Sequence, residues 1–165
     1  SPAEVSKLMK LSDSLTRLNV ERYKNYKRKF DQKNAKQALF AFNGDTYKGL
    51  EAYGIKKSDV NFAQNHLGIL SGLYGLVRPL DLIQPYRLEM GTKLSVDNYK
   101  DLYEFWGDSI TRELNKILSK EKYLINLSSN EYYSVIKEND YVSEIMDKYS
   151  VNTFHEDLGF PVNQC

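Results

Sequence analysis

The apolar residues of this chain come in short runs, and this restricts the folds that are open to it. The longest run, residues 67–76, is interrupted by three glycines, whereas a helix that crosses a bilayer needs roughly 20 apolar residues in succession. The 165 residues are 41% hydrophobic, which is enough for a chain of this length to bury a core. We therefore expect one folded domain over residues 1–165 that neither spans nor contacts a membrane.

Cysteine content and the start of the chain bear on the cellular compartment. Cys165 is the single cysteine, so an internal disulfide is excluded. The first residues lack the basic, apolar and small-residue pattern of a secretory leader. Both observations predict a cytoplasmic protein.

Capping residues and apolar spacing predict a mixed, helix-rich α+β fold with a small central sheet. The clearest helix start is Ser1-Pro2-Ala3-Glu4, a capping box with proline at the first helical position. Further helices are predicted from Ser12 or Ser14, over residues 47–53, from Ser58 to about Gly72, from Asp101 over residues 102–118, and over residues 131–136. Strands are predicted over residues 38–42, 86–90, 123–127 (buried) and 151–154, with a helix after Asp31 as the alternative for the first of them.

The usual signatures of enzymes and metalloproteins are missing from the sequence. The candidate metal ligands His66, His155 and Cys165 lie far apart, without the close pairs of a zinc site. The chain has no Gly-x-Ser-x-Gly elbow, Walker motif or dinucleotide fingerprint. We expect no metal, no cofactor and no catalytic residue of a standard kind.

Charge is distributed unevenly along the chain. Residues 1–57 carry 13 Lys and Arg against 6 Asp and Glu, a net charge of +7, and the remainder carries −6. Five cations lie within residues 22–29, interleaved with two tyrosines: Arg22, Lys24, Lys27, Arg28 and Lys29. On a helix Lys24, Lys27 and Arg28 share a face that could follow a phosphate backbone. The alternative is a solvated helix surface without a partner.

A second candidate site is the glycine-rich segment 70–79. Gly72 and Gly75 are three residues apart, and a tight turn there could present successive backbone N–H groups to a phosphate oxygen. Arg78 follows closely and could add a charge-assisted hydrogen bond. The alternative is a glycine helix cap with a turn that packs on Leu73 and Tyr74.

Charged side chains of both signs follow this segment. Arg78, Asp81, Arg87 and Glu89 lie in a region punctuated by proline, where ion pairs could fix an irregular backbone. Together with Glu131 they could instead line a cleft and supply carboxylates for acid–base chemistry.

Four segments of the chain resemble one bacterial family, the YaaA peroxide-stress-resistance proteins. The longest is residues 66–91, HLGILSGLYGLVRPLDLIQPYRLEMG, and three shorter ones are residues 41–50 (AFNGDTYKGL), 100–108 (KDLYEFWGD) and 125–132 (INLSSNEY). The matches follow in order across most of the chain, from about Glu4 to Tyr132. The resemblance implies a cytosolic protein that protects DNA and limits damage by free iron during peroxide stress.

The resemblance also implies a mixed α/β fold particular to the family, a positively charged cleft and a helix-hairpin-helix element that binds double-stranded or branched DNA. Carried over to this sequence, the hairpin is placed at Ser71, Gly72, Leu73, Tyr74 and Gly75. Two residues separate the glycines here, where such hairpins usually have one between them.

The two ends depart from the family pattern. The family's first strand and its closing basic segment are not seen in this sequence, so we expect a fragment, with self-association possible because sheet edges would be exposed. The leading hypothesis is sequence-independent DNA binding through residues 71–75, Arg78 and Arg87, supported by the cations of residues 22–29. An enzyme that acts on DNA or on a small molecule in the Arg/Asp/Glu cleft is the alternative, and iron sequestration is a third, weaker one.

Overall fold

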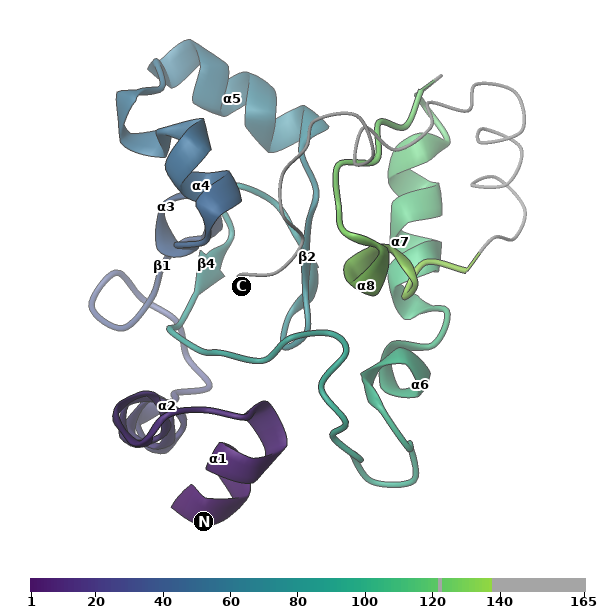
Figure 1. Ribbon diagram of the computed structural model, residues 1–165. Coiled ribbons are helices and arrows are strands. Elements are labelled where there is room, and N and C mark those ends of the chain that lie inside the picture. Colours follow the sequence, from purple (N-terminus) through teal and green to yellow (C-terminus); the bar gives the residue numbers. More distant parts are fainter. Residues whose placement is uncertain (122, 138–165) are drawn as a thin grey trace. The chain divides into compact units, whose positions relative to one another are not determined.

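The computed structural model describes residues 1–121 and 123–137 (Figure 1). Contacts between Cα atoms divide the chain into two compact units, residues 1–92 and residues from 93 onward. The described residues form short helices together with two antiparallel sheets of two strands each. The predicted helix-rich α+β class is therefore confirmed. Within the described residues, no helix is both long and apolar enough to span a bilayer.

The first unit opens with two helices that lie side by side, α1 (Pro2–Met9) and α2 (Asp13–Asn25) (Figure 1). The capping box forms as predicted, because the Glu4 N–H donates to Ser1 Oγ at 3.4 Å and the Glu4 carboxylate reaches back to the Ser1 nitrogen. Ser12 is the N-cap of α2, also as predicted, although its side chain makes no capping hydrogen bond.

The segment after α2 departs from prediction. The predicted strand over residues 38–42 is wrong: β1 (Lys36–Gln37) is followed by a helical turn, α3 (Ala38–Ala41). The Ala38 and Leu39 N–H groups donate to the carbonyls of Asp81 and Pro79 at 2.8 and 2.9 Å, and both side chains are buried. A short apolar run fits a buried helical turn as well as a strand, and these contacts decide for the turn.

Asp31 caps a turn and not a helix, since its carboxylate accepts from the N–H groups of Lys33 and Asn34. Farther on, α4 (Asp45–Leu50) is followed by the short 3-10 helix η1 (Ala52–Gly54). The predicted helix over residues 47–53 is thus interrupted at Glu51, which has a positive φ of 49°.

The glycine-rich segment forms a β-hairpin. Helix α5 (Lys57–His66) ends at His66, earlier than predicted, and β2 (Ile69–Ser71) pairs antiparallel with β3 (Gly75–Val77). The helix-hairpin-helix element expected here is not shown, because strands flank the turn. The short strand β4 (Leu82–Ile83) pairs with β1, and residues 86–90 do not form the predicted strand.

The core of the first unit lies between the hairpin, β4 and α3. It contains Ala38, Ile69, Val77 and Ile83, against which partly buried aromatic side chains pack: Phe42, Tyr47, Tyr74 and Tyr86. The rings of Tyr74 and Tyr86 meet edge to face with centroids 5.2 Å apart. These contacts fix the hairpin against the segment that follows β4.

The second unit contains α6 (Leu102–Trp106), α7 (Ser109–Leu118) and α8 (Asn130–Tyr133). Asp101 caps α6 as predicted, accepting from the Glu104 N–H at 2.9 Å. The predicted single helix is divided at Gly107, whose φ of +47° lies outside the range of a right-handed helix. The prediction of a helical turn over residues 131–136 is confirmed in part by α8, which ends at Tyr133.

The predicted buried strand over residues 123–127 is wrong. These residues belong to no strand, and Tyr123, Ile125 and Leu127 are all more than 60% exposed. The short apolar run predicts a buried strand, but no neighbouring strand among the described residues pairs with this segment. The predicted strand over residues 151–154 lies outside the described residues, as do His155 and Cys165.

Candidate nucleic-acid interface

The predicted basic residues lie at the end of α2 and in the loop that follows it. Lys24 is in the last turn of the helix, which ends at Asn25, and three further cations follow in the loop. We call Lys24, Lys27, Arg28 and Lys29 the basic loop. All four are exposed, and within the described part of the chain none of their side chains makes an ion pair.

The predicted helical face for these cations is wrong, and one buried side chain explains why. The Lys27 N–H donates to Gln84 Oε1 at 3.0 Å, and Gln84 Nε2 donates to the Lys27 carbonyl at 2.6 Å. Gln84 is 4% exposed. Because its carboxamide takes up both backbone groups of Lys27, the chain leaves the helix at Tyr26, where ψ is 132°.

Gln84 is itself held by the hairpin. The Tyr74 hydroxyl accepts from the Gln84 N–H at 3.0 Å and donates to the Gln84 carbonyl at 3.3 Å. Ser71 Oγ lies 2.6 Å from the Tyr86 hydroxyl and accepts from the Tyr74 N–H at 2.9 Å. A continuous chain of hydrogen bonds therefore runs from the buried hairpin through Gln84 to the basic loop.

Burial keeps the phenols of this network neutral. Desolvation raises the pKa of Tyr74 to about 12, partly offset by the hydrogen bond that its oxygen accepts from the Gln84 N–H. Desolvation also raises the pKa of Tyr86, against the opposing effect of the hydrogen bond from Ser71. Both hydroxyls can therefore donate at any pH near neutrality.

The hairpin does not present a row of free amides. The Tyr74 N–H is used by Ser71, and Ser71, Gly72 and Gly75 are buried, with Leu73 partly exposed. A Cβ added to Gly72 would lie 2.5 Å from the Leu88 carbonyl oxygen. Gly72 therefore permits a close backbone approach, and the expectation of outward amides fails at Gly72 and Tyr74.

The two predicted arginines each lie beside a carboxylate. Arg78 Nη2 is 3.5 Å from Asp81, whose other oxygen accepts from the Arg78 N–H at 2.8 Å. Arg87 Nη2 is 2.8 Å from Glu89. The four side chains thus form two local ion pairs, and the proposed fifth member of the cleft, Glu131, belongs to the second unit.

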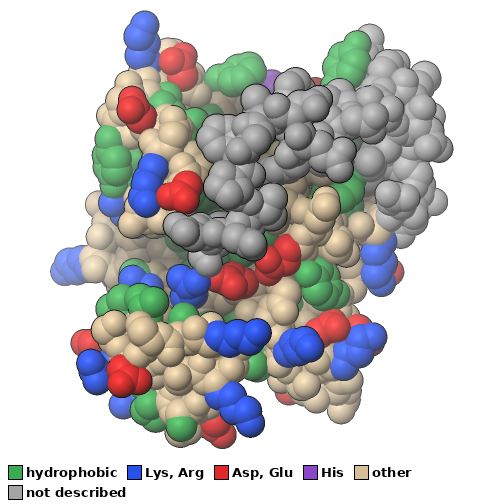
Figure 2. Space-filling view, viewed as in Figure 1, with side chains coloured by type: hydrophobic (Ala, Val, Ile, Leu, Met, Phe, Trp, Pro, Cys, Tyr) green, Lys and Arg blue, Asp and Glu red, His purple; other side chains and the backbone are tan. Residues whose placement is uncertain are grey.

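The excess positive charge belongs to the first unit. Residues 1–92 contain 15 Lys and Arg against 9 Asp and Glu, a net charge of +6. In Figure 2, Lys and Arg side chains lie over the part of the surface where Figure 1 places α1 and α2. In the part of the chain that the structure describes, no group of three or more His, Cys, Asp or Glu side chains could hold a metal ion.

The fold and charge define a class: a small α+β protein with a basic surface loop fixed by a buried hydrogen-bond network. The chain belongs to the family of the peroxide stress protein YaaA, whose model matches residues 1–157. Similar proteins include UPF0246 proteins of Acaryochloris marina, 56% identical over 137 residues, and Teredinibacter turnerae, 54% identical over 139 residues. Each match covers 83% of this chain and 54% of the relative, so the chain spans about half the length of these relatives.

Proposed function

We propose that this chain binds the DNA backbone without regard to sequence, as part of the peroxide stress response to which its family belongs. One observation carries the proposal: the basic loop bears four exposed cations that form no ion pair with any described residue, and Gln84 holds the backbone of one of them, Lys27. A cation that already pairs with a carboxylate binds a phosphate more weakly than an unpaired cation does. No carboxylate of the described residues competes in this way at Lys24, Lys27, Arg28 or Lys29.

Gln84 holds the Lys27 backbone through two hydrogen bonds, which we call the clamp, and this favours binding by the loop. A loop that is already ordered loses less conformational entropy when it binds than one that must be ordered by its ligand. Phosphate contacts release condensed counterions from duplex DNA, which makes the affinity fall steeply with salt. The loop therefore supplies the electrostatic part of binding, and nothing in it selects a base sequence.

The residues proposed here to contact DNA differ from those expected from the sequence alone. The hairpin, Ser71 to Gly75, acts as the support of the loop. Arg78 and Arg87 contribute less than the loop because Asp81 and Glu89 lie beside them. The Arg78 pair is exposed and the Arg87 pair is partly exposed; ion pairs that reach solvent are weak, so a phosphate can still compete for either arginine.

A charge-matched pair of variants tests the proposal. Lys27→Ala/Arg28→Ala removes two cations of the loop, while the backbone clamp on residue 27 stays possible. Lys56→Ala/Lys57→Ala removes two exposed cations at the start of α5. Affinity for a labelled 20-base-pair duplex, measured by fluorescence anisotropy, should fall at least tenfold for the loop variant and much less for the control. Equal losses for the two variants would overturn the assignment.

A further inference from the structure

Helix α2 buries polar side chains and exposes apolar ones, which is the reverse of the usual arrangement. Thr16 and Asn19 are buried, whereas Leu15 and Leu18 are 39% and 42% exposed. Asn19 is satisfied within the helix, because its Nδ2 donates to the Leu15 carbonyl at 2.9 Å and its Oδ1 accepts from Arg22 at 3.3 Å. Leu18 is therefore exposed on the surface of α2, in the part of the helix that precedes the basic loop.

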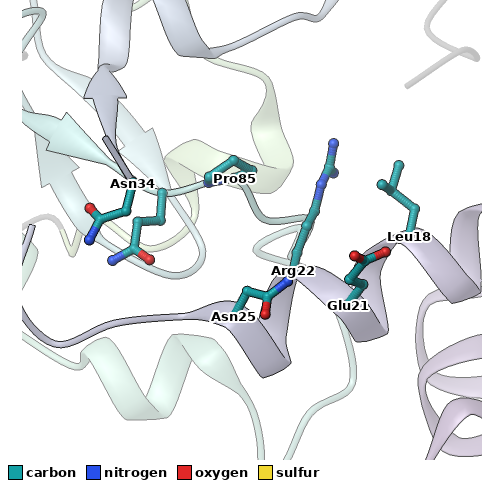
Figure 3. Close-up of a pocket in the computed structure, with 7 residues that line it drawn as sticks. Leu18, Glu21, Arg22, Asn25, Asn34 and Pro85 are labelled. Carbon is teal, nitrogen blue, oxygen red and sulfur yellow. The ribbon is translucent and has the colours of Figure 1, made fainter. Parts of the chain in front are cut away.

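A pocket of about 350 Å³ lies at this place (Figure 3). Its volume is within the range of sites that bind small organic groups. The lining comes from the last turns of α2, from the turn at residues 32–34 and from the segment after β4. Its residues are Leu18, Glu21, Arg22, Asn25, Asn34, Gln84 and Pro85. Figure 3 shows Leu18, Glu21, Arg22 and Asn25 along α2, with Pro85 and Asn34 across from them.

The lining combines apolar surface with unused hydrogen-bonding groups. Leu18 and Pro85 provide the apolar contacts. Glu21 and Asn25 make no side-chain hydrogen bond within the described residues, and Arg22 uses one of its five N–H groups on Asn19. The pocket therefore offers hydrogen-bond donors from Arg22, an acceptor from the Glu21 carboxylate, and both kinds of group from the Asn25 carboxamide. Among the described residues, none of these remaining groups is occupied by a hydrogen bond within the chain.

This chemistry fits a nucleobase better than a bare anion. The Glu21 carboxylate would repel a phosphate placed in the pocket. A nucleobase has apolar faces that pack on aliphatic side chains, and an edge that carries donors and acceptors together. Arg and Asn are side chains that commonly pair with such edges.

We propose that the pocket takes one unpaired nucleobase of the DNA whose backbone lies on the basic loop. The inference rests on the proposed function, because Arg22 and Asn25 flank Lys24 and the phosphates next to the base would reach the same loop. A paired base must lose its base pair before it can enter, whereas an unpaired base has no pair to break and costs less to extrude. A duplex with a single unpaired base should therefore bind about tenfold more tightly than an intact one, the effect expected when side chains pair with one base edge.

The probe is a 20-base-pair duplex with one bulged 2-aminopurine, compared with the fully paired duplex. The wild-type chain should bind the bulged duplex more tightly and change the 2-aminopurine fluorescence. Leu18→Ala and Asn25→Ala should abolish both effects and leave binding of the intact duplex unchanged. Leu15→Ala is the matched control, since Leu15 is on the same helix with similar exposure but does not line the pocket.

The outcomes separate the two proposals. If neither duplex binds, the proposed function fails and the base pocket fails with it. If both duplexes bind equally, or Leu15→Ala acts as Leu18→Ala does, the base pocket alone is overturned. A free deoxynucleoside monophosphate serves as competitor: if it binds as tightly as the bulged duplex, the pocket is a mononucleotide site and the DNA-borne base is excluded.

Discussion

Replacing Gly72 by alanine tests whether this glycine is needed for packing. The new Cβ would lie 2.5 Å from the Leu88 carbonyl oxygen and 3.3 Å from the Glu89 carbonyl carbon. Both are backbone atoms, so relief requires a main-chain shift, and overpacking of this kind costs about 3 kcal/mol. Alanine also reduces the entropy of the unfolded chain, which offsets roughly 0.7 kcal/mol. The net loss in the free energy of unfolding is therefore about 2 kcal/mol.

The assay is urea unfolding followed by far-UV circular dichroism. With an m-value near 2 kcal/mol/M, the midpoint should fall by about 1 M. Gly49→Ala is the control, because Gly49 lies within α4 with nothing within 4 Å of the added Cβ. That variant should be unchanged or more stable by up to about 1 kcal/mol. If Gly72→Ala is as stable as wild type and only DNA binding is weakened, the packing role assigned to Gly72 is refuted.

Three further perturbations test the hydrogen-bond network and the second unit. Gln84→Ala removes both hydrogen bonds to the Lys27 backbone and should lower the unfolding free energy by about 2 kcal/mol, together with DNA affinity; unchanged values for both would show that the clamp is dispensable. Burial raises the pKa of Tyr74 and Tyr47 to about 12, against about 10 in the unfolded chain. The stability that these neutral phenols contribute is therefore complete below pH 10 and is lost as the pH rises toward 12. A urea midpoint that stays constant from pH 9 to 11.5 would contradict this. Asp101→Ala removes the side-chain cap of α6 and should cost about 1 kcal/mol in chemical denaturation, whereas Asp101→Asn should retain most of it.

Three helix starts could be predicted because their signals are local, whereas the predicted cap Ser58 lies inside α5, whose N-cap is Lys56. Ser1, Ser12 and Asp101 each precede an apolar repeat, and a cap needs only the next three residues to act. The predicted strands at 38–42 and 123–127 failed because an apolar run carries no information about its partner. Two distant carbonyls bind the amides at the start of the first segment, and no described strand pairs with the second.

The candidate site was predictable in part for the same reason. The positive charge of residues 22–29 can be read directly from the sequence, but the buried side chain that holds this segment in place cannot. Gln84 lies 57 residues from Lys27, and nothing in the spacing of the two residues marks them as partners. A glycine needed for close packing also looks, in sequence, like one that frees an amide for a ligand, so the role of Gly72 required the fold.

The salt dependence of DNA affinity tests the role of the basic loop most directly. For the wild-type chain and the variant Lys24→Ala/Lys27→Ala/Arg28→Ala/Lys29→Ala, the association constant for one duplex is measured from 50 to 200 mM salt. Each phosphate contact adds about 0.9 to the slope of log affinity against log salt, so the variant should have a slope about 3.6 smaller in magnitude. An unchanged slope in the variant would mean that the phosphates are held elsewhere, and would contradict the assignment of the basic loop as the DNA-binding surface.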